Sequence, residues 1–188
     1  MMIHQLQVSY LIEQDRILVR LNSHGGEELR LWMTRRLSKN LLPHLVELAA
    51  RIDMQPGPST SHDGSDPQAL NEFKKQESLQ QADFSTPFNN EAAMLPMGGE
   101  PLLATSVHIT RHENGQLKLA FEEGLPGVEK LRSFEFMLGT DLLHALMHLL
   151  EKALQHADWG ITSGESADEH DASLLDAFAN AAPPKYLN

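Results

Sequence analysis

Residues 16–33, RILVRLNSHGGEELRLWM, contain the pattern on which the predicted fold depends. Apolar side chains occupy every second position in the first six residues and again in the last five. This period of two is typical of β-strands with one buried face. Gly25 and Gly26 separate the two runs, and glycine favours a turn because it adopts positive φ without a Cβ clash. The stretch therefore predicts a β-hairpin. Its inward residues are Ile17, Val19, Leu21, Leu29, Leu31 and Met33.

The pattern extends on both sides of this hairpin. Residues 6–12 alternate in the same way, which predicts a third strand before it. After Thr34, a residue type favoured at helix N-caps, the apolar period changes to about 3.6 as far as Ile52, which predicts a helix. Pro43 lies within this stretch, and proline in a helix interior costs about 3 kcal/mol. We therefore expect the helix to begin near Lys39, with Pro43 in its first turn, where a missing N–H does no harm.

The second half of the chain repeats this order of elements. Strands are predicted over residues 103–111, 116–122 and 130–138, because apolar side chains alternate there and turn residues lie between the runs. A helix follows, with a cap at residues 139–141 and an end near Ala157. Both halves thus follow one plan of three strands and a helix.

The sequence predicts an α+β fold in which two such units form an antiparallel sheet or open barrel covered by two helices. The stretch after the first unit is rich in proline, glycine and serine, which is typical of a linker. The predicted organisation is a first unit at residues 1–54, a flexible linker at 55–100 with a helix at 68–84, a second unit at 101–159, and an acidic tail at 160–188 with a short amphipathic helix.

Composition excludes several classes of protein. The 188 residues contain no cysteine, which excludes disulfides and thiolate chemistry. No window approaches the roughly 18 apolar residues of a membrane span, and the first 16 residues lack the regions of a secretory signal, so we expect a cytoplasmic protein without membrane contact. The net charge of −11 is uneven, since residues 1–52 carry +2 and residues 53–188 carry −13. Almost all the acidity therefore lies outside the first unit.

The sequence contains none of the motifs GxSxG, HExxH, GxxxxGK[ST] or GxGxxG. We therefore expect a protein that is not an enzyme and uses no cofactor. One metal site is a candidate, because His144, His148 and Glu151 are spaced to share a helix face. Imidazoles four residues apart chelate zinc or nickel, with the carboxylate as a third ligand. A solvated polar face explains the same spacing, and we favour that explanation.

The outward side of the predicted hairpin and the residues after it are rich in arginine. Arginines around an indole on an open sheet form a platform that contacts the phosphates and stacks the bases of a single nucleic-acid strand. The candidate residues are Arg16, Arg20, Arg30, Trp32, Arg35 and Arg36. In fold plan alone, two strand-rich repeats each closed by a helix resemble the Whirly and PUR families of single-strand-binding proteins, whose units have four strands. Pairing of the arginines with Glu13, Asp15, Glu27 and Glu28 is the alternative that we favour.

The acidic tail contains the last candidate site. Leu174, Leu175 and Phe178 form an amphipathic stretch too short to be stable alone, so it docks either on its own domain or on another protein. An acidic body with free strand edges and apolar patches is suited to binding short segments of partners. We therefore expect a non-enzymatic protein-interaction module, an adaptor or chaperone-like protein whose main partner is another protein. Single-stranded nucleic-acid binding and a metal-dependent enzyme are the alternatives, and association between copies is left open.

Overall fold

The computed structural model describes residues 3–53, 76–77, 86–90, 94–112, 114–128 and 131–160. The proline-rich part of the predicted linker, most of the helix predicted at 68–84 and the tail beyond Gly160 lie outside these residues. Within the described part the fold is α+β, as predicted, and the elements follow the order β1-β2-β3-α1-β4-β5-β6-β7-α3.

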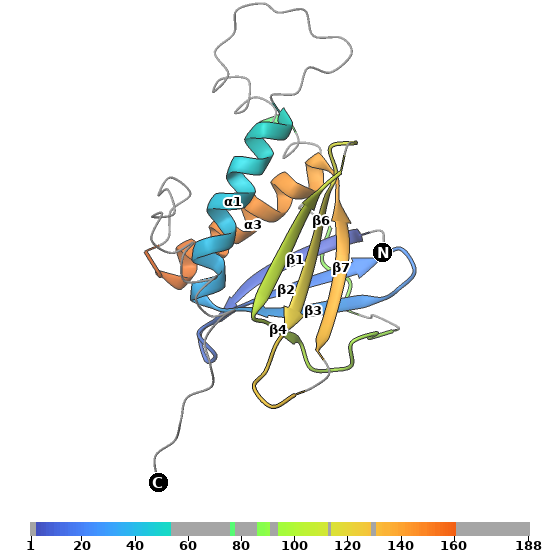
Figure 1. The fold of residues 1–188 in the computed structure, drawn as a ribbon, viewed down its shortest axis with the longest axis vertical. Coiled ribbons are helices and arrows are strands. Elements are labelled where there is room, and N and C mark those ends of the chain that lie inside the picture. Colours follow the sequence, from blue (N-terminus) through green and yellow to red (C-terminus); the bar gives the residue numbers. More distant parts are fainter. Residues whose placement is uncertain are drawn as a thin grey trace, which may run out of the picture.

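The first three strands form the predicted meander (Figure 1). They are β1 (Ile3–Leu11), β2 (Arg16–Ser23) and β3 (Glu28–Met33). β2 is antiparallel to both neighbours, and Val19 lies opposite Val8 on one side and Leu31 on the other. All six predicted inward side chains of the hairpin are buried. The period of two in residues 16–33 is therefore confirmed as a pair of strands with one buried face.

Helix α1 (Arg35–Asp53) begins earlier than the sequence predicts. Thr34 is its N-cap, as expected, because its Oγ1 accepts a hydrogen bond of 3.3 Å from the backbone N–H of Leu37. The expected start near Lys39 is wrong, and Pro43 lies in the helix interior. The cap and the packing of Leu37 against the core offset the hydrogen bond that proline cannot donate.

The second half contains one more strand than the sequence predicts. Its elements are β4 (Leu102–Ala104), β5 (Ser106–Arg111), β6 (Leu117–Glu123), β7 (Arg132–Leu138) and α3 (Thr140–Ala157). Helix α3 begins and ends where the sequence predicts. The single strand expected at 103–111 is divided at Thr105 into β4 and β5.

The division at Thr105 separates two sheets. The N–H of Thr105 donates to the carbonyl of Glu122 over 2.9 Å, although the residue paired with Glu122 is Ser106. Two residues of this strand thus face one residue of β6, which is a β-bulge, and bulges bend and twist a strand. Before the bulge β4 pairs in parallel with β3, and after it β5 pairs antiparallel with β6. The strands therefore form two sheets, β1-β2-β3-β4 and β5-β6-β7, in place of one antiparallel sheet.

Both sheets and both helices share one apolar interior. Buried side chains from both sheets, among them Leu31 and Phe136, form a single cluster with Leu45 of α1 and Leu150 of α3. Figure 1 shows α1 and α3 together on one side of the two sheets, whose strands run in different directions. α3 packs against β1 and against α1. The helices therefore close the side on which the apolar faces of the sheets meet.

Trp159 joins the end of α3 to the first half of the chain. Its side chain is only 5% exposed, and its Nε1 donates to Oδ1 of Asp15 in the β1–β2 turn over 2.8 Å. The hydroxyl of Tyr10 donates to the same oxygen over 2.9 Å, and the Tyr10 and Trp159 rings meet edge to face. Arg35 at the start of α1 donates to the carbonyl of Trp159. One carboxylate and one indole thus connect β1, α1 and α3.

We expect Trp159→Phe to lower the free energy of unfolding by about 1–2 kcal/mol, because a smaller aromatic ring remains in place but the hydrogen bond from Nε1 to the Asp15 carboxylate is lost. Trp159→Ala should cost about 3–5 kcal/mol, since it also leaves a cavity. Urea unfolding followed by circular dichroism measures both. Trp32→Phe on the half-buried outer side of β3 is the control, with a smaller loss. Equal stability of Trp159→Phe and the wild type would contradict the role of the Asp15 contact.

Candidate functional site

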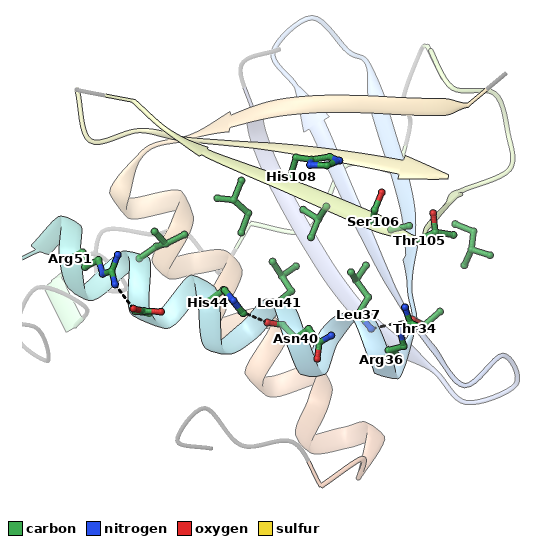
Figure 2. A pocket seen from close by; sticks show the side chains of 16 residues that line it. Thr34, Arg36, Leu37, Asn40, Leu41, His44, Arg51, Thr105, Ser106 and His108 are labelled. Atoms are coloured by element: carbon green, nitrogen blue, oxygen red, sulfur yellow. Dashed lines mark hydrogen bonds and ion pairs between the residues drawn. The ribbon is translucent and has the colours of Figure 1, made fainter. Parts of the chain in front are cut away.

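A groove runs between α1 and β5 (Figure 2). One end of the groove lies where β3 and β4 both end, at the pair Met33 and Ala104. There the chain leaves the sheet through Thr34 and enters α1. At the other end a Cβ at Gly115, in the β5–β6 turn, would lie 4.0 Å from Cγ2 of Ile52 in α1. Between these two points helix and strand are separated by a space of about 780 Å³. The groove follows β5 from Ser106 to Ile109.

The floor of the groove is apolar and its rim carries charge. Strand β4 contributes Leu103 and Ala104 to its lining, and α1 and β5 contribute five further apolar side chains, four of which are only half-buried. They are Leu37, Leu41, Leu48, Val107 and Ile109. The charged or titratable groups on the rim are Arg36, His44, Glu47, Arg51 and His108. Apolar surface that remains accessible beside charged side chains is typical of a binding site.

The edge of β5 that faces the groove is unpaired within the part of the chain that the structure describes. Its one strand partner there is β6, and no backbone group of a described residue on the groove side hydrogen-bonds to its backbone. The N–H of His112 donates to the carbonyl of Gln116, the residue opposite it in the continued register. Hydrogen-bonded pairs alternate along an antiparallel ladder, so the even-numbered residues of β5 bond to β6. Val107 and Ile109, which line the groove, therefore direct their N–H and C=O groups away from β6 and into it, and Arg111 directs its own to the same side beyond the lining.

The arginine surface predicted from the sequence is built around a buried carboxylate. Glu28 is 1% exposed, and its Oε1 accepts hydrogen bonds from Nε of Arg20 (2.7 Å) and Nε of Arg30 (2.6 Å). Nη2 of Arg20 also donates to Oε2. Burial alone would raise the pKa of Glu28, but the hydrogen bonds from Arg20 and Arg30 outweigh it and hold the pKa below its ordinary value of 4.5. The favoured alternative, in which arginines of this surface pair with acidic residues, is thus observed for Arg20 and Arg30 at Glu28.

A second segment covers part of this surface. The Phe88 ring lies 4.5 Å from the guanidinium carbon of Arg20, and Oδ1 of Asn90 accepts a hydrogen bond from Nη1 of the same arginine. The carbonyl of Asn89 accepts one from Asn22 on β2. Arg20 is therefore engaged on two sides by its own chain.

Two of the candidate arginines, Arg35 and Arg36, lie on α1 and not on the sheet face that carries Arg20 and Arg30. Arg35 donates to the carbonyl of Trp159, and Arg36 lies on the rim of the groove. Arg16 at the start of β2 and Trp32 on β3 are half-buried and lie on the same outer face as Arg20 and Arg30, because residues an even number apart in a strand share a face. The six residues are thus distributed over three environments.

The metal candidate is placed differently from the expectation. His144 is 2% exposed, and its Nε2 lies 3.2 Å from Oδ2 of the buried Asp53 at the end of α1. The expected solvated face is therefore wrong at His144, because α1 packs over this side of α3. His148 and Glu151 are half-buried. In the part of the chain that the structure describes, no three His, Asp or Glu side chains come together in a way that could hold a metal ion.

The tail candidates, Leu174, Leu175 and Phe178, lie outside the described residues.

The sequence does not predict the groove. Its signals were present, since Val107 and Ile109 alternate along a strand and Leu37 and Leu48 belong to the stripe of the first helix. Which strand lies at an edge, and how far a helix stands from it, depends on contacts between distant parts of the chain.

We expect Glu28→Gln to lower the free energy of unfolding at pH 7 by about 1–3 kcal/mol, because two arginines lose a buried charged acceptor. The folded pKa of Glu28 is depressed, so its stabilisation is present above pH 4.5 and is lost as the pH falls through the folded value. The stabilities of wild type and variant should therefore converge at low pH.

Urea unfolding at pH 7 and at about pH 3 measures this difference. Glu47→Gln is the matched control, because Glu47 is also paired with an arginine, Arg51, but its side chain is 60% exposed. Exposed pairs of this kind contribute about 0.5 kcal/mol or less. Equal losses from the two variants would show that Glu28 is no more important than a surface pair.

No protein-family model matches the chain, and neither a curated protein nor a solved structure is significantly similar to it. Among the helices that the structure describes, none combines the length and the apolar character needed to cross a bilayer. Function is therefore inferred from the groove and its chemistry.

Proposed function

We propose that this protein is a non-enzymatic protein-interaction module whose groove between α1 and β5 binds a short extended segment of a partner protein. The observation that supports this proposal is the edge of β5, which has no strand partner among the described residues on the groove side and lies beside a floor of mostly half-buried apolar side chains. An adaptor or chaperone-like protein needs a site of this kind, because it recognises short segments through backbone and apolar contacts.

The dimensions of the groove support a segment of about six residues. Along α1, Arg36 and Arg51 are fifteen positions apart, which corresponds to about 22 Å at 1.5 Å per residue. β5 has six residues, which span about 20 Å at 3.3 Å per residue. The two walls are thus matched in length. The volume of about 780 Å³ would also suit a small molecule, so the unpaired strand edge, and not the volume, favours a peptide.

The charges of the groove favour a segment with acidic flanks. Arg36 and Arg51 lie toward its two ends, and His44 and His108 lie between them on the rim. Arg51 is paired with Glu47, so with neutral histidines the described lining carries a net charge of +1, from two arginines and one carboxylate. Residues 53–188 carry a charge of −13, so the surface around the first unit is the least acidic part of the chain. Electrostatic steering would therefore direct Asp and Glu of a partner toward this groove.

Single-stranded nucleic acid is the other partner class that the sequence suggests. It has less support, because Arg20 and Arg30 share the buried Glu28 and because Phe88 and Asn90 lie against Arg20. Phosphate binding requires arginines that contact solvent and lose counterions to the ligand.

Selection from a random library of twelve-residue peptides against the full chain tests the proposal. We expect the selected peptides to lose at least tenfold in affinity for Val107→Asp and for Leu48→Asp, which place a charge on opposite walls of the groove. Fluorescence anisotropy with labelled peptides measures the affinities, and circular dichroism verifies folding. Ile12→Asp is the matched control, because Ile12 is 74% exposed in the β1–β2 turn and away from the groove lining.

Peptides that bind both groove variants as tightly as the wild type would overturn the proposal. Binding of a single-stranded DNA dodecamer that falls steeply with salt and disappears when Arg16, Arg20 and Arg30 are replaced together would favour the nucleic-acid alternative.

A further inference from the structure

The strand formed by β4 and β5 is paired unevenly on its two sides. On the side of β3, the ladder covers β4 up to the pair Met33 and Ala104 and then stops, because the chain turns into α1 at Thr34. β5 continues for six residues with β6 on one side and the groove on the other. The groove therefore occupies the place that an extension of β3 would take.

The backbone groups at this edge are arranged to pair with a strand. Val107, Ile109 and Arg111 alternate with the residues that bond to β6, so their N–H and C=O groups recur at about 6.6 Å along this edge. This is the spacing at which an added strand presents its own partners. A ligand that lacks a peptide backbone would leave these groups to water.

Helix α1 restricts what can reach the edge. It runs beside β5 (Figure 2) and ends near the β5–β6 turn, where a Cβ at Gly115 would lie 4.0 Å from Ile52. The edge is therefore open to a narrow chain and screened from another sheet. Exposed edges are otherwise templates for unwanted pairing between copies. Because α1 lies across the groove from β5, the edge is accessible to one added strand and protected from pairing with the sheet of another copy.

From this geometry we infer that the partner segment binds as an additional β-strand on the edge of β5, parallel or antiparallel to it, and pairs with the backbone of Val107, Ile109 and Arg111. The inference rests on the proposed function and specifies its contacts. Side chains of the segment on the face shared with Val107 and Ile109 would pack beside Leu41 and Leu48. The partner is therefore a segment with apolar residues at alternate positions and Asp or Glu at its flanks, opposite Arg36 and Arg51.

The two variants Ile109→Pro and Ile109→Ala separate backbone pairing from side-chain packing. Proline removes the N–H that points into the groove and leaves the β6 ladder intact, because the residues that bond to β6 are the even-numbered ones. Alanine removes the same apolar side chain and keeps the N–H. We expect the selected peptides to bind Ile109→Pro at least tenfold more weakly than Ile109→Ala. Equal affinities of two folded variants would overturn strand addition, while the effects of Val107→Asp and Leu48→Asp would still support the groove.

A measurement on the wild-type protein covers the case in which Ile109→Pro fails to fold. Each residue of a selected peptide is replaced in turn by its N-methyl analogue, which cannot donate a backbone hydrogen bond. Strand addition predicts losses at every second position across about six residues, because alternate N–H groups face β5. Amide exchange should also slow at Ile109 and Arg111 on binding. Losses without a period of two, or unchanged exchange at these amides, would overturn the inference.

Two other occupants of the groove, the chain's own C-terminal residues and a second copy of the chain, are distinguished by further measurements. If the chain's own residues 161–188 fill the groove, replacing Leu174, Leu175 and Phe178 by Asp should tighten peptide binding at least tenfold. If a second copy fills it, sedimentation should show a dimer that Ile109→Pro dissociates and Ile109→Ala does not. Either result would overturn the assignment to a partner protein.

Discussion

The bulge at Thr105 is the constraint on which the rest of the structure depends. It allows one strand to belong to both sheets, first as β4 beside β3 and then as β5 beside β6. Because the strand bends here, the apolar faces of the two sheets enclose one interior that α1 and α3 close. The same bend separates β5 from the end of β3. The groove is therefore a consequence of how the two halves of the chain are joined.

Local patterns predicted much of this fold, and contacts between distant residues account for what they missed. The period of two in residues 16–33 identified the buried face of the hairpin, since alternation depends only on neighbours along the strand. The start of α1 was placed too late, because the penalty at Pro43 was given more weight than the cap at Thr34. His144 was placed on a solvated face, because the sequence does not show that Asp53 and the end of α1 lie over it. The open edge of β5 could not be predicted, because alternation reveals a strand and not its neighbours.

Charge composition predicts an excess of positive charge in the first unit, but it does not predict which groups the arginines contact. Residues 1–52 have a small excess of arginine and lysine, which suggested a surface for phosphates. Two of the arginines instead surround Glu28, whose burial is tolerated because two guanidinium groups satisfy its oxygens. Arg20 also holds the segment with Phe88 and Asn90 against the sheet. Two other arginines, Arg36 and Arg51 of α1, lie on the rim of the groove and place positive charge beside it.

The size of the groove sets the kind of interaction that it supports. A strand of about six residues buries much less than the roughly 1,200 Å² of stable protein complexes. Each net backbone hydrogen bond contributes about 0.5–1.5 kcal/mol, and part of this is offset by the entropy lost when the segment becomes ordered. Affinity at this site should therefore be modest and exchange fast, with little dependence on which apolar side chains are present, because the backbone contacts are common to all sequences. Under the proposed function, modest affinity and fast exchange suit an adaptor or chaperone-like protein that meets several partners better than a subunit of a permanent complex.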